Sequence, residues 1–188
     1  MRLFIAVPLP TEIADRAAAC LPLALPAVRP VRADLMHLTL AFLGQVTDDR
    51  LAAAIAAAQT GADGHRAFDL SLDHAGTFLR AGRPRAVWLG AGAGIDELTG
   101  LAAGVTRALA DRSFSLEDRA FSAHLTLARV RPDASAAESR TIARSVERLI
   151  VPELCIRVDQ IAVVESRLSP KGPRYATRFD IRLGQPEV

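Results

Sequence analysis

The sequence predicts an α+β fold of two pseudo-symmetric lobes, each an antiparallel sheet flanked by helices, with a central cleft between them. Strand-like and helix-like segments are mixed without the strict alternation of a doubly wound fold. The pentapeptide His-Leu-Thr-Leu-Ala occurs twice, at 37–41 and at 124–128, which indicates two related halves. The length of 188 residues fits two small lobes that share a core. We therefore expect residues 1–188 to form a single bilobal domain.

The first half of the chain is expected to hold four strands and two helices. The strands are expected in four short apolar or alternating segments: Arg2–Leu9, Leu35–Leu43, Phe68–Asp73 and Arg85–Leu89. Thr11 can cap a helix that follows the first strand. Thr47, followed by two aspartates, supplies a cap and an acidic first turn for an alanine-rich helix that ends near Gly61.

The second half is expected to hold two further helices and three strands. From Ile95 to Asp111 apolar residues recur at every third or fourth position, as they do on one face of a helix. Ser135 and Glu138 have the form of a capping box that begins the next helix. The apolar face of that helix is expected to comprise Ile142, Val146, Leu149 and Ile150. The strands are expected at Ala123–Val130, Leu154–Glu165 and Tyr175–Leu183, with a loop at 169–173 between the last two.

Charge and cysteine usage narrow the possible function classes. The chain has 23 Lys and Arg against 21 Asp and Glu, a net charge of +2, which is too small to attract nucleic acid to the whole surface. Any anion site must therefore be local. Cys20 and Cys155 lie far apart and neither belongs to a C-x-x-C pair, so we expect two buried thiols in a reducing compartment.

The hydrophobic segments predict neither a signal peptide nor a membrane span. The apolar run at the start of the chain is interrupted by Pro8, Pro10 and Glu12. No other apolar run approaches the roughly 20 residues that cross a bilayer. We expect a cytoplasmic, monomeric protein with no membrane partner.

The repeated pentapeptide carries the candidate chemistry. Side chains of a strand alternate between faces, so His37 and Thr39 point to one side, about 6 to 7 Å apart, while the leucines point to the other. His124 and Thr126 form the equivalent pair. If the halves pack with pseudo-two-fold symmetry, both pairs line one cleft.

Two imidazoles facing one space suit a displacement at phosphorus. One can take a proton from the attacking water while the other gives a proton to the leaving oxygen. Threonine hydroxyls can hydrogen-bond the non-bridging oxygens. Neither His37 nor His124 has a second metal ligand two to four residues away, so we expect neither a metal nor a cofactor. The repeat does not tell which histidine is the acid.

Other notable residues have plainer interpretations. His65 and His74 lack the threonine two positions later, so we assign them no function. Trp88 lies in an apolar strand and is expected in the core rather than as a base-stacking platform.

Two H-x-T-x motifs in a chain of this size resemble the two-histidine (2H) phosphoesterase superfamily. The flanking sequences are similar to those of the bacterial and archaeal RNA 2′,3′-cyclic phosphodiesterases, long called 2′-5′ RNA ligases. The similar segments are Arg2–Ala6, His37–Gly44, Ala75–Gly76, Val87–Gly90, Phe121–Arg129 and Glu165–Leu168 with Gly172 and Tyr175. The resemblance therefore covers nearly the whole chain.

The resemblance implies a two-lobed α+β fold and metal-free hydrolysis of a terminal 2′,3′-cyclic phosphate on RNA or oligonucleotide ends to a 2′-phosphate. It implies that His37 donates a proton to the departing 3′ oxygen and that His124 activates water. It also implies that Thr39 and Thr126 hold the phosphate.

Two flanking positions qualify this resemblance. Ala123 stands where the family commonly has proline. Arg129 matches a recurrent family arginine and is a candidate phosphate ligand. Strict alternation places Arg129 opposite His124, so that role requires the strand to end or bulge before it. A surface or ion-pair role is the alternative.

Two other functions remain open at this point. The same residues could join or open 2′-5′ linkages or act on another cyclic nucleotide. Alternatively, the chain could be a non-catalytic RNA- or nucleotide-binding module that uses the cleft to hold phosphate.

Overall fold

The computed structural model describes residues 1–22, 25–116, 120–170 and 172–185. Its strands form one nine-stranded sheet within these ranges, and every neighbouring pair of strands in it is antiparallel. The strands are β1 (Arg2–Pro8), β2 (Val28–Pro30), β3 (His37–Gln45), β4 (Phe68–Arg80), β5 (Arg83–Ala91), β6 (His124–Val130), β7 (Leu154–Val158), β8 (Gln160–Ser169) and β9 (Gly172–Arg182).

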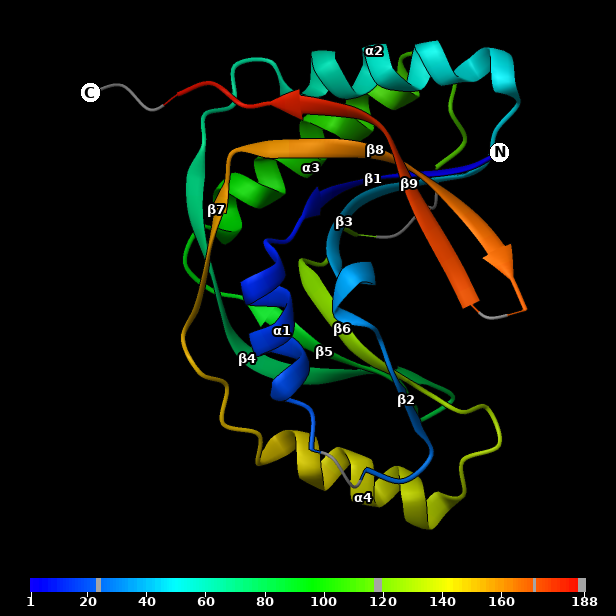
Figure 1. Ribbon diagram of the computed structural model, residues 1–188, viewed down its shortest axis with the longest axis vertical. Coiled ribbons are helices and arrows are strands. Elements are labelled where there is room, and N and C mark those ends of the chain that lie inside the picture. Colours follow the sequence, from blue (N-terminus) through cyan, green and yellow to red (C-terminus); the bar gives the residue numbers. More distant parts are fainter. Residues whose placement is uncertain (23–24, 117–119, 171, 186–188) are drawn as a thin grey trace.

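The helices lie along this sheet, two toward one end, one toward the other end and one between them (Figure 1). They are α1 (Thr11–Ala19), α2 (Leu51–Ala62), α3 (Ile95–Ala110) and α4 (Ala136–Glu147), with 3-10 turns at Ala33–Leu35 and Asp48–Arg50. In the upper half of the view, α2 and α3 pack on each other, with α3 against β3 and α2 against β8 and β9. In the lower half, α4 packs against β4 and β5. The α+β class is confirmed.

The order of the strands shows the pseudo-symmetry that the repeated pentapeptide predicts. The sheet runs β7-β4-β5-β6-β3-β1-β8-β9, with β2 beside β6. If β6 is exchanged with β3, β5 with β1, β4 with β8 and β7 with β9, the result is the same order read from the other end of the sheet. Each half therefore contributes one equivalent strand to the centre, β3 from one and β6 from the other, and each of these strands carries one copy of the repeat.

Several expected helix features need correction. Neither Thr11 nor Thr47 makes a side-chain cap, because Thr11 is already helical and Thr47 precedes a 3-10 turn rather than α2 itself. The capping box of α4 is confirmed, with the Glu138 amide donating to Ser135 Oγ at 3.2 Å and the Ser135 amide donating to Glu138 Oε2 at 2.7 Å. The helix ends at Glu147, so its expected apolar face stops short, and Ile150 is 90% exposed.

The strands also differ in extent from the expectation. The strands expected at Phe68–Asp73 and Arg85–Leu89 are longer in the structure, where β4 and β5 form one hairpin with a tight turn. They extend beyond the apolar segments because polar and glycine residues near the turn also pair across the hairpin. The segment expected as one strand at Leu154–Glu165 is two, β7 and β8, which separate at Asp159. The short strand β2 was not expected. Part of the loop expected at 169–173, residue 171, lies outside the described residues.

The structure also tests what the sequence predicted about the two cysteines and about membrane-spanning segments. Cys20 is partly exposed and Cys155 is exposed, so the expectation of two buried thiols is wrong, although both are free. None of the helices within the described ranges has the length and apolar character needed to span a bilayer.

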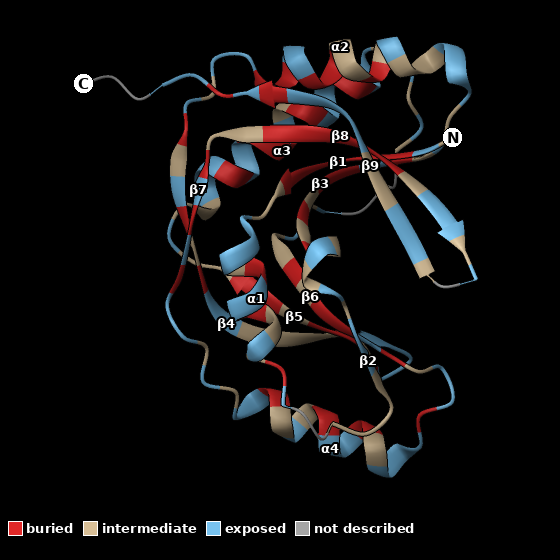
Figure 2. Ribbon diagram, viewed as in Figure 1, coloured by how far each residue is buried: buried red, intermediate tan, exposed pale blue. Residues whose placement is uncertain are grey.

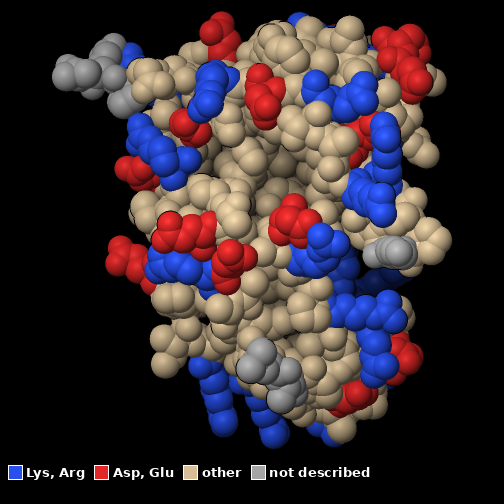
Figure 3. All heavy atoms as spheres, viewed as in Figure 1, with Lys and Arg blue, Asp and Glu red and all other residues tan. Residues whose placement is uncertain are grey.

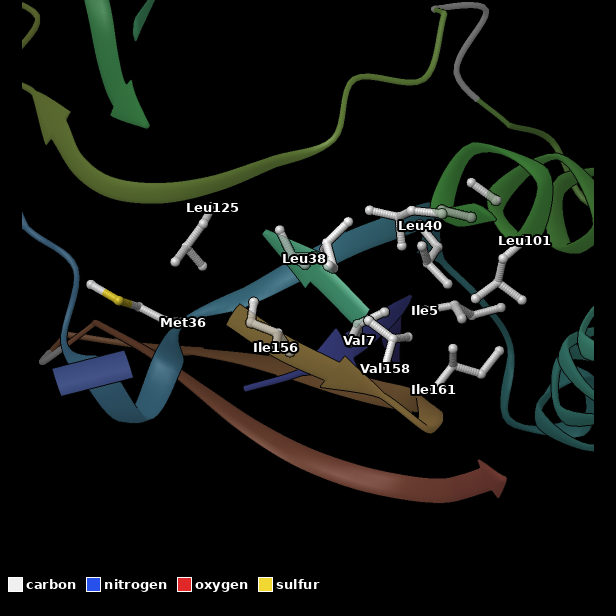
Figure 4. Close-up of a cluster of buried hydrophobic side chains, with 14 of the residues drawn as sticks. Ile5, Val7, Met36, Leu38, Leu40, Leu101, Leu125, Ile156, Val158 and Ile161 are labelled. Atoms are coloured by element: carbon white, nitrogen blue, oxygen red, sulfur yellow. The ribbon is translucent and has the colours of Figure 1, made fainter. Parts of the chain in front are cut away.

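The core lies on the face of the sheet that the helices cover (Figure 2). Leu38, Leu40, Leu125 and Leu127 of the two repeats belong to it and are 1%, 4%, 0% and 1% exposed. Figure 4 shows Leu38 and Leu40 among side chains from β1, β7 and α3. The repeat leucines thus anchor both central strands from behind, as the alternation predicts.

Helices α2 and α3 approach closely at a glycine. A Cβ on Gly61 would overlap the backbone of Val105, so only glycine allows this crossing. Gly100 of α3, in contrast, has no atom closer than 3.6 Å to an added Cβ.

We predict opposite effects for alanine at these two glycines. Gly61→Ala should destabilise the fold by about 1 to 3 kcal/mol, because helix backbone rather than a side chain must move. Gly100→Ala should instead stabilise it by about 0.5 to 1 kcal/mol through helix propensity. Urea unfolding of both variants checks this, and equal effects would contradict the close crossing.

Candidate active site

The two repeats meet at the centre of the sheet. β3 and β6 pair antiparallel with Leu38 opposite Leu125. This register sets His37 beside Thr126 and Thr39 beside His124. All four polar side chains are more exposed than the leucines between them, and they share the face opposite the core. We call this surface, defined by His37, Thr39, His124 and Thr126, the histidine face.

Arg129 reaches the histidine face because β6 bulges. Thr126 pairs with Trp88 and Ala128 pairs with Val87, which leaves Leu127 as an extra residue. Leu127 and Ala128 are consequently both buried, and Arg129 returns to the exposed side. The bulge that a role for Arg129 at phosphate requires is therefore present.

β3 carries the same irregularity at the same place in its repeat. Thr39 pairs with Ala6 and Ala41 pairs with Ile5, so Leu40 is the extra residue. Phe42 then occupies the position in β3 that Arg129 occupies in β6, and it is 45% exposed. The two halves thus differ at this point, with an aromatic ring on one side and a cation on the other.

Main-chain carbonyl groups fix both imidazoles in the same way. His37 Nδ1 lies 2.9 Å from the Leu35 carbonyl oxygen, and His124 Nδ1 lies 2.8 Å from the Ser122 carbonyl oxygen. Because a carbonyl only accepts hydrogen bonds, each Nδ1 carries a hydrogen and donates it. Proton transfer to a ligand then falls to Nε2 in both residues.

Aromatic side chains pack against each imidazole. Phe4 stacks on His37 with ring centroids 4.7 Å apart, and Tyr175 meets the same imidazole edge-on at 5.3 Å. On the other side, Phe78 meets His124 edge-on at 4.6 Å. The sequence marked none of these three aromatic residues as part of a site, because they come from strands far apart in the chain.

The hairpin that carries Tyr175 is held by a buried carboxylate. Glu165 of β8 is 7% exposed and accepts hydrogen bonds from Arg167 at 2.9 and 3.0 Å and from Arg178 of β9 at 3.3 Å. The hydrogen bonds from Arg167, with the charges of both arginines, hold the pKa of Glu165 below its usual range. This cluster ties β9 to β8 and so holds Tyr175 against His37.

The environment of His37 favours its neutral form. Burial lowers its pKa from the usual value, and the positive charges of His124 and Arg129 add to this effect, whereas the hydrogen bond to Leu35 opposes it. His124 and Arg129 belong to the other half of the chain, so the charge acting on His37 comes across the centre of the sheet.

Trp88 and His74 differ from their expected roles. Trp88 is half-buried rather than in the core, and its ring lies 5.4 Å from Phe78 and 5.8 Å from His74. The bulge in β6 and the alternation of β5 turn it to the histidine face. His74, which we assigned no function, lies on the same side, and its Nδ1 is 2.7 Å from Asp73 Oδ1.

Charged side chains elsewhere and one further cavity of the described residues lie apart from the histidine face. Figure 3 shows acidic and basic side chains mixed over one face, with basic ones gathered along its right-hand edge. A cavity of about 550 Å³ lies at the opposite end of β3, between Met1, Gln45 and Glu165. It shares no residue with the histidine face. Among the described residues, no group of three or more His, Cys, Asp or Glu is arranged to hold a metal ion.

We predict that His37 titrates below about 6.5, the usual histidine value. Because its pKa is lowered in the folded protein, its neutral form adds stability above the unfolded value, and this stability is lost as pH falls through the lowered value. Arg129→Gln removes a cation and should raise the pKa of His37. NMR titration of the ring measures both.

Arg157→Gln is the matched control for this titration, because Arg157 pairs with Asp69 on another part of the sheet. It should leave the pKa of His37 unchanged. A titration at or above the usual histidine value would contradict the buried, electropositive setting.

Several known proteins are similar to this chain in architecture and in sequence. The family model described as LigT like Phosphoesterase matches residues 7–88 and 89–175. The RNA 2′,3′-cyclic phosphodiesterase of Archaeoglobus fulgidus is 32% identical over 177 residues, covering 93% of this chain and 96% of the relative. The protein of the same name from Escherichia coli K12 is 41% identical over 132 residues, covering 68% and 71%.

A solved structure agrees over the whole fold. The crystal structure of Escherichia coli LigT complexed with 3′-AMP has a TM-score of 0.76 and 31% sequence identity, and the match covers 98% of each chain. The family match extends over both halves and includes both repeats. With its two-lobed antiparallel sheet, this chain belongs to the LigT-like phosphoesterase family.

Proposed function

We propose that this chain hydrolyses the terminal 2′,3′-cyclic phosphate of RNA to a 2′-phosphate, with His37 and His124 as the acid and base and without a metal. The observation that carries the proposal is the symmetric presentation of two His/Thr pairs on one face, each imidazole fixed through Nδ1. The names of the relatives support the substrate class, since they are RNA 2′,3′-cyclic phosphodiesterases.

The proposed reaction is one displacement at phosphorus. His124 Nε2 takes a proton from water, whose oxygen bonds to phosphorus as the bond to the 3′ oxygen breaks. His37 Nε2 gives a proton to that departing oxygen, which leaves a 3′-hydroxyl and a 2′-phosphate. The hydroxyl groups of Thr39 and Thr126 donate to the non-bridging oxygens, and Arg129 places a positive charge beside them.

The direction of proton transfer rests on the family resemblance. The lowered pKa of His37 in the free protein works against a donor, which must be protonated before reaction. A bound cyclic phosphate is an anion, and its charge beside His37 raises that pKa in the complex. The donor role of His37 therefore depends on substrate binding.

We further propose that the protein acts as a monomer in the cytoplasm. Both His/Thr pairs come from one chain, which supports a single bilobal domain over residues 1–188 that acts as a monomer. Cys20 and Cys155 are free and apart, which suits the reducing cytoplasm.

The test is hydrolysis of a nucleoside 2′,3′-cyclic phosphate by protein stripped of metal with a chelator. The wild type should convert it to the 2′-phosphate. His37→Ala and His124→Ala should each lower kcat by about 100-fold to 10,000-fold, as expected for loss of an acid or base.

His65→Ala is the control for losing a histidine away from the histidine face, and its rate should match the wild type. Full activity in either catalytic variant would refute the acid and base roles. Tight binding of the cyclic phosphate without turnover by the wild type would instead favour a non-catalytic binding module.

A further inference from the structure

A second group of side chains lies beside His124 on the histidine face. Pairing across three strands puts His74 of β4, Gly90 of β5 and His124 in one row. The next row holds Gly76, Trp88 and Thr126. We call the surface formed by His74, Phe78 and Trp88 the Trp88 surface.

Two glycines shape the Trp88 surface. A Cβ on Gly76 would overlap three atoms of the Trp88 indole, so the ring lies against the backbone of β4. One face of the indole is therefore covered by the sheet, and the ring as a whole is half-buried, so part of it remains open to a ligand. The neighbouring ring of Phe78 extends this aromatic surface to His124. Such a platform stacks nucleobases without regard to sequence.

His74 supplies a hydrogen-bond acceptor at the edge of the platform. A Cβ on Gly90 would overlap the imidazole at Nε2, so His74 leans over Gly90 along this row, in the direction of His124. Its Nδ1 lies 2.7 Å from the Asp73 carboxylate, which only accepts, so Nδ1 carries the hydrogen. In the neutral imidazole, Nε2 is then an acceptor. The side chain as a whole is 56% exposed, which leaves room for a ligand beside it.

The chemistry of the substrate limits what can donate to this acceptor. In a 2′,3′-cyclic phosphate the terminal ribose has no free 2′-hydroxyl, because that oxygen is bonded to phosphorus. A free 2′-hydroxyl first occurs on the preceding nucleotide. Two strand spacings separate the backbone of His74 from that of His124, about 10 Å, which is the length scale of one nucleotide.

The other half of the site can hold the terminal nucleoside. Phe42 is 45% exposed on the histidine face, and its ring lies 6.0 Å from that of Phe4, which stacks on His37. A terminal nucleoside has one base and can occupy one aromatic surface. The Trp88 surface on the opposite side then faces the next nucleotide.

We propose that the Trp88 surface is the subsite for the nucleotide on the 5′ side of the cyclic phosphate, with its base stacked on Trp88 and its 2′-hydroxyl donating to His74. The inference rests on the proposed cyclic phosphodiesterase activity. It makes His74 and Trp88 determinants of preference for an RNA chain end over a mononucleotide.

The experiment compares kcat/KM for four substrates. These are cytidine 2′,3′-cyclic phosphate, the dinucleotide that adds a 5′ adenosine to it, the same dinucleotide with 2′-deoxyadenosine, and the same dinucleotide with an abasic ribose. The wild type should prefer the adenosine dinucleotide to the mononucleotide by about tenfold or more, and the abasic compound should lose most of this preference. The deoxy compound should react about fivefold more slowly than its ribose counterpart.

Variants assign these preferences to residues. His74→Ala should abolish the difference between the ribose and deoxyribose dinucleotides, whereas His74→Gln, which keeps a polar group near the Nε2 position, should retain part of it. Trp88→Leu should reduce the advantage of the adenosine dinucleotide over the abasic one, and Trp88→Phe should preserve it. His65→Ala is the histidine control and should leave every ratio as in the wild type.

The outcomes separate this inference from the proposed function. A wild type that hydrolyses the mononucleotide and the dinucleotide equally well retains the proposed function and overturns the subsite. So does a ribose preference that survives His74→Ala, or an adenosine advantage that survives Trp88→Leu. A wild type that hydrolyses none of the four substrates overturns the proposed function itself.

Discussion

The antiparallel pairing of β3 and β6 at Leu38 and Leu125 is the interaction on which the rest of the structure depends. It buries the repeat leucines and, because strand side chains alternate, it forces His37 and His124 to the opposite face. A shift of either strand by one residue would move an imidazole into the core and a leucine to the surface. The depth of burial of the leucines makes that shift costly, so the core itself determines where the histidines point.

Identical bulges then give the two halves different chemistry. Both central strands carry one extra leucine after the threonine, which brings the residue after the following alanine onto the histidine face. In β6 this residue is Arg129 and in β3 it is Phe42. Symmetry therefore provides two matched imidazoles, while the bulges add a cation to one side and an aromatic ring to the other. This difference makes the two ends of the histidine face chemically unlike.

Much of the fold followed from the sequence, because it depends on local patterns and on the repeat. The alternation around His37 and His124 placed each histidine with its threonine, and the pseudo-two-fold packing inferred from the repeat brought the two pairs together. The Ser135 capping box is formed by neighbouring residues. The long β4–β5 hairpin was missed because polar and glycine residues near its turn pair although they break the apolar pattern. The break at Asp159 was missed because β7 pairs with β4, a strand far away in the chain.

Several residues of the site were also missed because their contacts join strands that are far apart in the chain. Phe4, Phe78 and Tyr175 contact the imidazoles from three strands, and no short-range pattern connects them. Trp88 was expected in the core because its neighbours are apolar. The close approach allowed by Gly76 instead lets its indole lie, half-buried, against the backbone of β4 on the histidine face. The sequence showed that Arg129 could reach the phosphate only if β6 bulged. Whether β6 bulges depends on its pairing with β5, which the sequence alone does not reveal.

The assignment of His37 as proton donor and His124 as base is tested most directly by changing the leaving atom. In the 3′-thio analogue of the cyclic phosphate, sulfur replaces the departing oxygen and leaves as a thiolate without a proton. On this substrate the defect of His37→Ala should shrink by about 100-fold relative to the oxygen substrate, because a proton donor is no longer needed. The defect of His124→Ala should persist. Equal defects of both variants on both substrates, or rescue of His124→Ala instead, would contradict the account.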